Sequence, residues 1–131
     1  MKNGFPDTEQ LPTMHEALSC IPVRNSVVEE SVDDNGLVLL RYPLAYKPWF
    51  GKLAGLFGSS PQALEKRLQL DELGSFCWRL MNDTRSVREI IACFREHYSL
   101  QESEARDSVS AFVRELGRRG IIIVTAPEDV R

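Results

Sequence analysis

The sequence predicts an α+β domain of winged-helix type, in which a three-stranded antiparallel sheet is followed by three helices. Asn35-Gly36 is the strongest short hairpin signal, because both positions tolerate a positive φ. Residues 64–70 alternate with the period of a half-buried strand. In the last half of the chain, apolar residues recur with helical spacing. The order differs from a conventional winged helix, whose wing follows its last helix.

The first half predicts a short helix and all three strands. Residues 1–12 have the composition of a loose tail. Thr13 and Glu16 fit a capping box, which predicts a short helix that ends before Pro22. Residues 23–32 are rich in strand-forming side chains and predict one strand, which residues 37–42 pair with across the hairpin. Residues 64–70 predict the third strand, with its polar side chains facing outward.

Two of the three predicted helices lie between residues 71 and 98. Asp71 fits the N-cap of the first helix, and Ser86 with Glu89 forms a capping box at the start of the second. The apolar stripe of the first helix consists of Leu73, Phe76, Cys77 and Leu80. The apolar side of the second consists of Val87, Ile90, Ile91, Phe94 and Tyr98.

The third helix is predicted to be the longest. Ser99 and Glu102 fit a capping box at its start, and Gly120 fits the position just after its last turn. Its predicted core-facing residues are Ala105, Val109, Phe112 and Leu116. The apolar run 121–124 that follows predicts a strand or a packed tail.

Length and composition limit the class of protein. The chain has 131 residues, which suits about one domain, and a formal net charge of −3. Its longest apolar run is far short of the ~20 residues of a membrane-spanning helix. The N-terminus lacks the apolar stretch of a secretion signal, so we expect a cytoplasmic protein. The three cysteines show no CxxC spacing, which argues against a disulfide framework and a zinc ribbon.

Little in the sequence points to catalysis. His15 and His97 form no metal-binding pair, and no phosphate-binding, dinucleotide-binding or nucleophile-elbow motif is present. Cys77 and Cys93 fall within predicted helices, where cysteine usually behaves as a small apolar residue. We therefore expect a protein that is not an enzyme and that uses neither a cofactor nor a metal.

A segment of about twenty residues, 43–62, separates the second and third predicted strands. The wider range 37–64 holds three basic residues, five aromatic residues and no acidic residue. Such a segment could pack on the core, dock on a partner or rest on a membrane interface. The docking residues would then be Tyr46, Trp49, Phe50 and Lys52.

Two stretches of the chain resemble the PqqD-like family of peptide-binding domains, also called RiPP recognition elements. They are LQLDELGSFCWRLMNDTRSVREIIACF at residues 68–94 and AFVRELGRRGIII at residues 111–123. The residues that match the family pattern are Leu70, Asp71, Gly74, Trp78, Ser86, Val87, Glu89, Ile90, Phe112, Leu116, Gly120, Ile121 and Ile122. The resemblance extends over residues 22–124, with residues 1–21 and 125–131 as tails.

This resemblance implies a non-catalytic adaptor. Such domains bind the leader of a precursor peptide as an added strand against the third strand, in a groove shared with the third helix. They then present the peptide to a radical S-adenosylmethionine maturation enzyme, in synthesis of pyrroloquinoline quinone (PQQ) or of another peptide product. The implied peptide-binding residues are Lys66, Arg67, Leu68 and Gln69 on the strand, and Arg106, Val109, Ser110, Val113 and Arg114 on the helix.

Other interpretations stay open at this point. The helix flank could be an ordinary solvated face, and the open strand edge could pair with a second copy to give a homodimer. A winged-helix domain could instead bind nucleic acid. Residues 102–119 hold four acidic and four basic side chains, however, and a recognition helix without net positive charge is a poor nucleic-acid footprint. We therefore expect no nucleic-acid partner.

Overall fold

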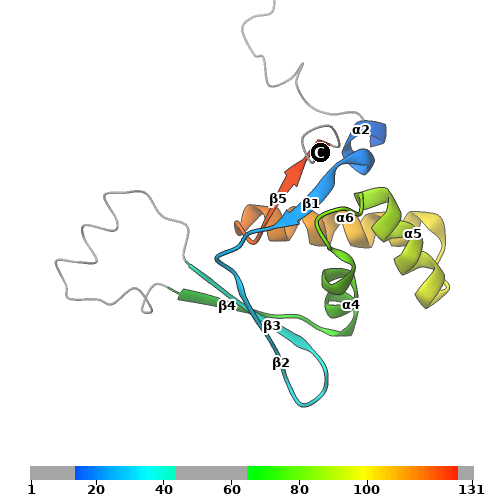
Figure 1. The fold of residues 1–131 in the computed structure, drawn as a ribbon. Helices are drawn as coiled ribbons and strands as arrows, with labels where there is room; N and C mark the ends of the chain where they lie inside the picture. Colours follow the sequence, from blue (N-terminus) through cyan, green and yellow to red (C-terminus); the bar gives the residue numbers. More distant parts are fainter. Residues whose placement is uncertain (1–13, 44–64, 127–131) are drawn as a thin grey trace, which may run out of the picture.

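The computed structural model of the protein describes residues 14–43 and 65–126 (Figure 1). They form an α+β fold with an antiparallel sheet of three strands, as the sequence predicts. In chain order the elements are α2 (Met14–Ser19), β1 (Ile21–Arg24), β2 (Glu29–Val32), β3 (Val38–Pro43), β4 (Glu65–Gln69), α4 (Glu72–Leu80), α5 (Val87–Tyr98), α6 (Glu102–Arg118) and β5 (Ile122–Thr125). The segment 43–62 with Tyr46, Trp49, Phe50 and Lys52 lies, apart from Pro43, outside the described residues, and so does the tail 1–12.

The predicted hairpin and third strand are both present. The strand order is β2-β3-β4, and both pairings are antiparallel. At the hairpin turn, the Asp33 carboxylate accepts hydrogen bonds from the backbone N–H groups of Asn35 and Leu37, each 2.9 Å long. Gly36 has a φ of 81°, a left-handed conformation that glycine adopts without strain. Local turn chemistry thus sets the register of β2 against β3.

The prediction of a single strand over residues 23–32 is wrong. The chain turns at Asn25, whose side-chain oxygen accepts a hydrogen bond from Val27 N–H, and whose own N–H donates to Ile121 O at 2.9 Å. β1 therefore leaves the three-stranded sheet and pairs with β5 in an antiparallel pair of their own, against α6 (Figure 1). Asparagine favours this break because its side chain competes for backbone hydrogen bonds.

α4 begins at its predicted N-cap but buries a different face. The Asp71 carboxylate accepts a hydrogen bond from Gly74 N–H at 2.8 Å. Leu73, predicted on the buried stripe, is 45% exposed, whereas Ser75 and Trp78 are buried. The hydroxyl of Ser75 accepts a hydrogen bond from Val38 N–H at 2.9 Å, and this bond turns that side of α4 toward the sheet.

Both ends of α6 follow local rules, but its start differs from the prediction. Ser99 does not cap α6; it ends α5 in a left-handed conformation with a φ of 54°. The capping box of α6 pairs Gln101 with Glu104 instead. At the other end, Gly120 has a φ of 79°, and Ile121 N–H donates to Leu116 O at 2.9 Å. This is a Schellman ending, as the glycine predicts.

The core lies between the helices and one face of the three-stranded sheet. From the sheet it contains Val38, Leu40 and Tyr42, which alternate along β3. The largest completely buried side chains are Trp78, Phe94, Leu40, Met81, Ile90, Leu116 and Ile121. In the part of the chain that the structure describes, no helix has the length and apolarity needed to cross a membrane.

Candidate functional site

β4 lies at an edge of the sheet and, among the described residues, pairs only with β3. Leu70 N–H donates to Val38 O at 2.9 Å, which fixes the phase of the ladder. Hydrogen-bonded and non-hydrogen-bonded pairs alternate in antiparallel strands. The backbone N–H and C=O groups of Leu68 and Lys66 therefore point toward β3 and bond to it. The N–H and C=O groups of Glu65, Arg67 and Gln69 therefore point toward the open edge. This edge can accept another strand.

The side chains of β4 alternate between two faces of the sheet. Lys66 and Leu68 share the face of Tyr42 and Leu40, which is the core side. Glu65, Arg67 and Gln69 lie on the outer face. Lys66 and Arg67 are exposed, and Leu68 is half-buried against the core. The Gln69 side chain donates to the backbone oxygens of Val38 and Leu70, both at 3.1 Å, and so holds the end of the strand in place.

A hollow of about 270 Å³ opens where β4 ends and α4 begins. Its walls come from α4, α5 and α6, and consist of Asp71, Leu73, Gly74, Cys77, Phe94, Ser108 and Phe112. It shares Leu73, Phe94 and Ser108 with a neighbouring hollow of about 510 Å³ that extends toward Tyr98 and Leu100. Together the two hollows form a trough along the helices, beyond the C-terminal end of β4. Most of its lining is apolar, and Asp71, Glu104 and Asp107 add three carboxylates to it.

Gly74 leaves room for the Phe112 ring of α6 beside the start of α4. A Cβ atom at this position would lie 3.3 Å from the Phe112 ring and 3.2 Å from the Asp71 carboxylate. Its N–H group also donates the capping hydrogen bond to Asp71. The absence of a side chain therefore keeps the Phe112 ring against the start of α4, where it forms a wall of the trough.

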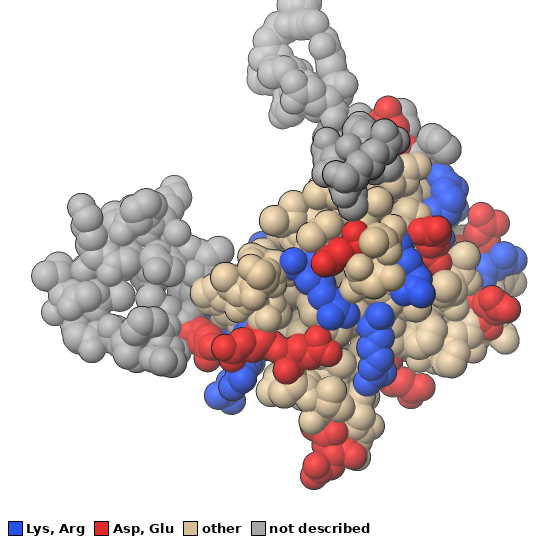
Figure 2. All heavy atoms as spheres, in the orientation of Figure 1, with Lys and Arg blue, Asp and Glu red and all other residues tan. Residues whose placement is uncertain are grey.

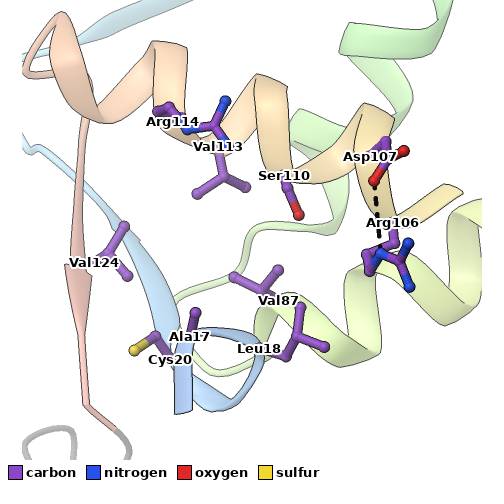
Figure 3. Close-up of a pocket in the computed structure, with 10 residues that line it drawn as sticks. All are labelled: Ala17, Leu18, Cys20, Val87, Arg106, Asp107, Ser110, Val113, Arg114 and Val124. Atoms are coloured by element: carbon purple, nitrogen blue, oxygen red, sulfur yellow. Dashed lines mark ion pairs between the residues drawn. The ribbon is translucent and has the colours of Figure 1, made fainter. Parts of the chain in front are cut away.

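The predicted α6 wall faces elsewhere. A different hollow, of about 640 Å³, lies on this side of α6 (Figure 3). Its lining from α6 consists of Arg106, Asp107, Ser110, Val113 and Arg114. The rest of the lining comes from α2 and the residue that follows it, from α5 and from β5, and consists of Ala17, Leu18, Cys20, Val87 and Val124. Neither this hollow nor the trough is lined by a residue of β4 itself. The trough is lined by Asp71 and Gly74, which follow β4 closely in the chain, whereas this hollow is lined by no residue between 65 and 86. Val109 is completely buried, so its side chain supports the helix from the core side. The structure therefore does not bring these α6 residues together with Lys66, Arg67, Leu68 and Gln69 in one groove.

The opposite flank of α6 faces the three-stranded sheet. Phe112 contacts the start of α4, and Arg119 Nη1 donates a hydrogen bond to the Tyr42 hydroxyl on β3 at 2.7 Å. Phe112 was expected in the core but is only half-buried, whereas Val113, expected on the exposed flank, is buried. This flank contains Ser108, Phe112 and Arg119, whose spacing in the sequence places them on one side of a helix. The residues of the other flank have the same kind of spacing, so the sequence alone does not show which flank of α6 faces the sheet.

The charged groups near the end of α6 hold one another in place. The Glu115 carboxylate lies 2.6 Å from both Arg118 Nη2 and Arg119 Nε. The pKa of Glu115 is lowered by its hydrogen bonds, first from Arg118 and to a smaller extent from Arg119. The pKa of Arg119 is raised, mainly by its hydrogen bond to the Tyr42 hydroxyl. Elsewhere basic and acidic side chains are interspersed, with acidic side chains at the tip of the β2–β3 hairpin (Figure 2). On the face in view, the surface therefore carries single charges of both signs rather than one large patch of a single sign.

The described residues offer no obvious reactive group at this site. Cys77 lines the trough, but burial followed by the nearby Asp71 charge raises the pKa of its thiol to about 12. A thiol with such a pKa is protonated at neutral pH and is a weak nucleophile. Over residues 14–43 and 65–126, no group of three or more His, Cys, Asp or Glu side chains is arranged to hold a metal ion.

Comparison with known proteins supports one family. Residues 62–122 match the family model described as Coenzyme PQQ synthesis protein D (PqqD). The matched range contains β4, α4, α5 and α6, which supply the open strand edge and the trough beside it. No curated protein and no solved structure matches the chain.

Proposed function

Because residues 62–122 make this chain PqqD-like, we propose that it is a non-catalytic adaptor that binds a precursor peptide and presents it to a maturation enzyme. The family is one of coenzyme PQQ synthesis. The proposed ligand is the leader segment of the precursor, and the proposed enzyme is of the radical S-adenosylmethionine type. The compound made from the precursor peptide is PQQ or another peptide-derived product.

The observation that carries this proposal is the open edge of β4. An added strand gains affinity from main-chain hydrogen bonds and selectivity from pockets for alternate side chains. Glu65, Arg67 and Gln69 supply the outward-pointing main-chain groups. Lys66, Arg67, Leu68 and Gln69 are thus the proposed contact residues on the strand. The same edge would also suit the β4 strand of a second copy of the chain. A peptide titration must therefore distinguish peptide binding from pairing of two copies.

The trough beyond β4 supports the proposal from the helix side. Leu73 is 45% exposed and Phe112 is half-buried, so both present apolar surface next to the strand edge. We propose that Ser108 and Phe112 take the place of Arg106, Ser110, Val113 and Arg114 as the α6 wall. An extended peptide that continues past Leu70 would place its apolar side chains in this trough.

The proposal is tested by titrating the ¹⁵N-labelled protein with synthetic precursor peptides encoded by neighbouring genes. The expected result is that amide signals of Glu65, Arg67 and Gln69 shift together with those of Leu73 and Phe112. Arg106→Ala and Arg114→Ala serve as matched controls, because both residues line the other hollow and should leave the affinity unchanged. Absence of any shift at high micromolar peptide contradicts the function. Shifts that depend on protein concentration without peptide indicate pairing of two copies instead.

A further inference from the structure

One row of charged side chains crosses the outer face of the three-stranded sheet. The register places Glu29 of β2 opposite Arg41 of β3, and Arg41 opposite Arg67 of β4. Paired residues in neighbouring strands project from the same face, so the three side chains lie side by side. The row therefore runs from one acidic residue through two basic residues to the open edge of β4.

The two arginines of this row differ in their partners. Arg41 Nη2 lies 2.8 Å from Glu29 Oε1, which compensates its charge. Arg67 is exposed and forms no ion pair with any residue in the described ranges. Its neighbour across the ladder is Arg41, and like charges directly opposite one another are unfavourable. The row thus ends at the edge with an arginine that forms no ion pair within the described residues.

We propose that the strand added to β4 carries a carboxylate at the position directly opposite Arg67. This inference rests on the proposed function, because it assigns the residue pattern that the edge selects. The backbone groups of Arg67 point toward the edge, so Arg67 and its ligand partner form a hydrogen-bonded pair whose side chains share the outer face. The carboxylate extends the row to acidic, basic, basic, acidic, and each arginine then has one acidic neighbour.

The neighbouring residues of β4 fix where along the edge this carboxylate lies. Glu65 and Gln69 each lie two positions from Arg67 on the same outer face. A ligand shifted by two residues would therefore place its carboxylate opposite the carboxylate of Glu65 or opposite the uncharged amide of Gln69. A shift by one residue would turn the carboxylate to the inner face. At the correct register, the ligand residue next to the carboxylate lies opposite half-buried Leu68 and is apolar. The selected pattern is therefore one acidic residue beside an apolar residue in an extended segment.

The experiment uses two seven-residue probe peptides that alternate valine with threonine, so that their apolar side chains share one face. The central residue, on the threonine face, is glutamate in one probe and lysine in the other. With the wild-type full chain, the glutamate probe should bind about three- to tenfold more tightly, as expected for an opposite-charge pair compared with a like-charge pair across strands. Arg67→Glu should reverse this preference. Arg95→Glu, a charge reversal at an exposed position of α5, should preserve it.

The outcomes separate this inference from the function on which it rests. If both probes shift the Arg67 and Gln69 amides with equal affinity, the charge rule is overturned while strand addition stands. A preference for glutamate that Arg67→Glu does not change also overturns the rule, because the selectivity then comes from elsewhere. If neither probe shifts any amide of β4, both the charge rule and strand addition at this edge are contradicted. The preference should also shrink in high salt, since the charges are exposed.

Discussion

The guanidinium group of Arg24 lies over the indole ring of Trp78, with its Cζ atom 4.1 Å from the ring centroid. Glu30 Oε1 accepts a hydrogen bond from Trp78 Nε1 at 3.0 Å and lies 3.3 Å from Arg24 Nη1. Arg24 also donates to the backbone oxygen of Trp78. One cluster therefore joins β1, β2 and α4, and holds the two sheets in a fixed relation.

Removing Arg24 should destabilise the fold through this cluster. We expect Arg24→Ala to lower the free energy of unfolding by about 1–3 kcal/mol, from the lost stacking and charged hydrogen bonds. Arg24→Lys should recover less than half of that loss, because a compact ammonium group lacks the planar fork that lies over the indole while its two Nη groups reach Glu30 and the Trp78 backbone oxygen. Urea unfolding measures both values. Arg95→Ala is the exposed control, and a loss of equal size there would contradict the role of the cluster.

Two leucines on neighbouring strands should differ in their contribution to stability. Leu40 is completely buried, so Leu40→Ala should cost about 2–5 kcal/mol. Leu68 is only half-buried, so Leu68→Ala should cost about 1 kcal/mol, in proportion to the smaller area removed from water. Leu68→Ala should also weaken peptide binding. Thermal or urea unfolding measures both losses. Equal losses of stability in the two variants would contradict the half-buried position of Leu68.

Proline substitutions at adjacent positions of β4 can separate binding from folding. Arg67→Pro removes an N–H group that points to the open edge, where proline is tolerated, so the protein should fold while peptide binding falls sharply. Leu68→Pro removes an N–H group that bonds β3 and should cost about 3 kcal/mol or more of stability. Circular dichroism and peptide titration measure the two effects. Arg67→Gln keeps the N–H group and controls for loss of charge, and a folded Arg67→Pro variant that binds as tightly as Arg67→Gln would argue against strand addition.

Glu115 should show a pH dependence set by its arginine partners. Hydrogen bonds from Arg118 and Arg119 lower the pKa of Glu115 in the folded protein. Its contribution to stability is therefore present above the ordinary glutamate pKa of about 4.3 and is lost as the pH falls through the lower folded value. Carboxyl NMR titration should find a midpoint below the ordinary value, and Arg118→Gln should raise it. An unshifted midpoint in the wild type would contradict these contacts.

The Cys77 thiol should be protected in the folded protein. Burial and the Asp71 charge raise its pKa to about 12, so almost no thiolate is present at pH 8. In a variant with Cys20→Ser and Cys93→Ser, a thiol reagent should modify Cys77 only at the rate at which the protein opens. Adding denaturant should make the reaction fast. Rapid labelling of the folded variant would contradict the burial of this side chain.

The sequence allowed the local features to be predicted better than the long-range ones. The hairpin at Gly36, the cap at Ser86 and the ending at Gly120 each depend on a few adjacent residues, and all three are confirmed. The break at Asn25 was missed, because β1 pairs with residues near the other end of the described chain. Whether the α6 residues Arg106, Ser110, Val113 and Arg114 share one groove with β4 was not foreseeable from the sequence for a related reason. Helical spacing defines an apolar stripe, but only tertiary packing decides which flank faces β4.

The pairing of β1 with β5 has a consequence for the order of folding. Ile21 and Thr125 are partners although 104 residues separate them, and the Thr125 hydroxyl donates to Ile21 O at 3.1 Å. Closing so long a loop costs entropy before its contacts contribute, so this pair should form late compared with the hairpin and the helices. During synthesis on the ribosome, β1 is made first and must wait for β5 to emerge. The open edge of β4 can thus be complete while the strand pair against α6 has not yet formed.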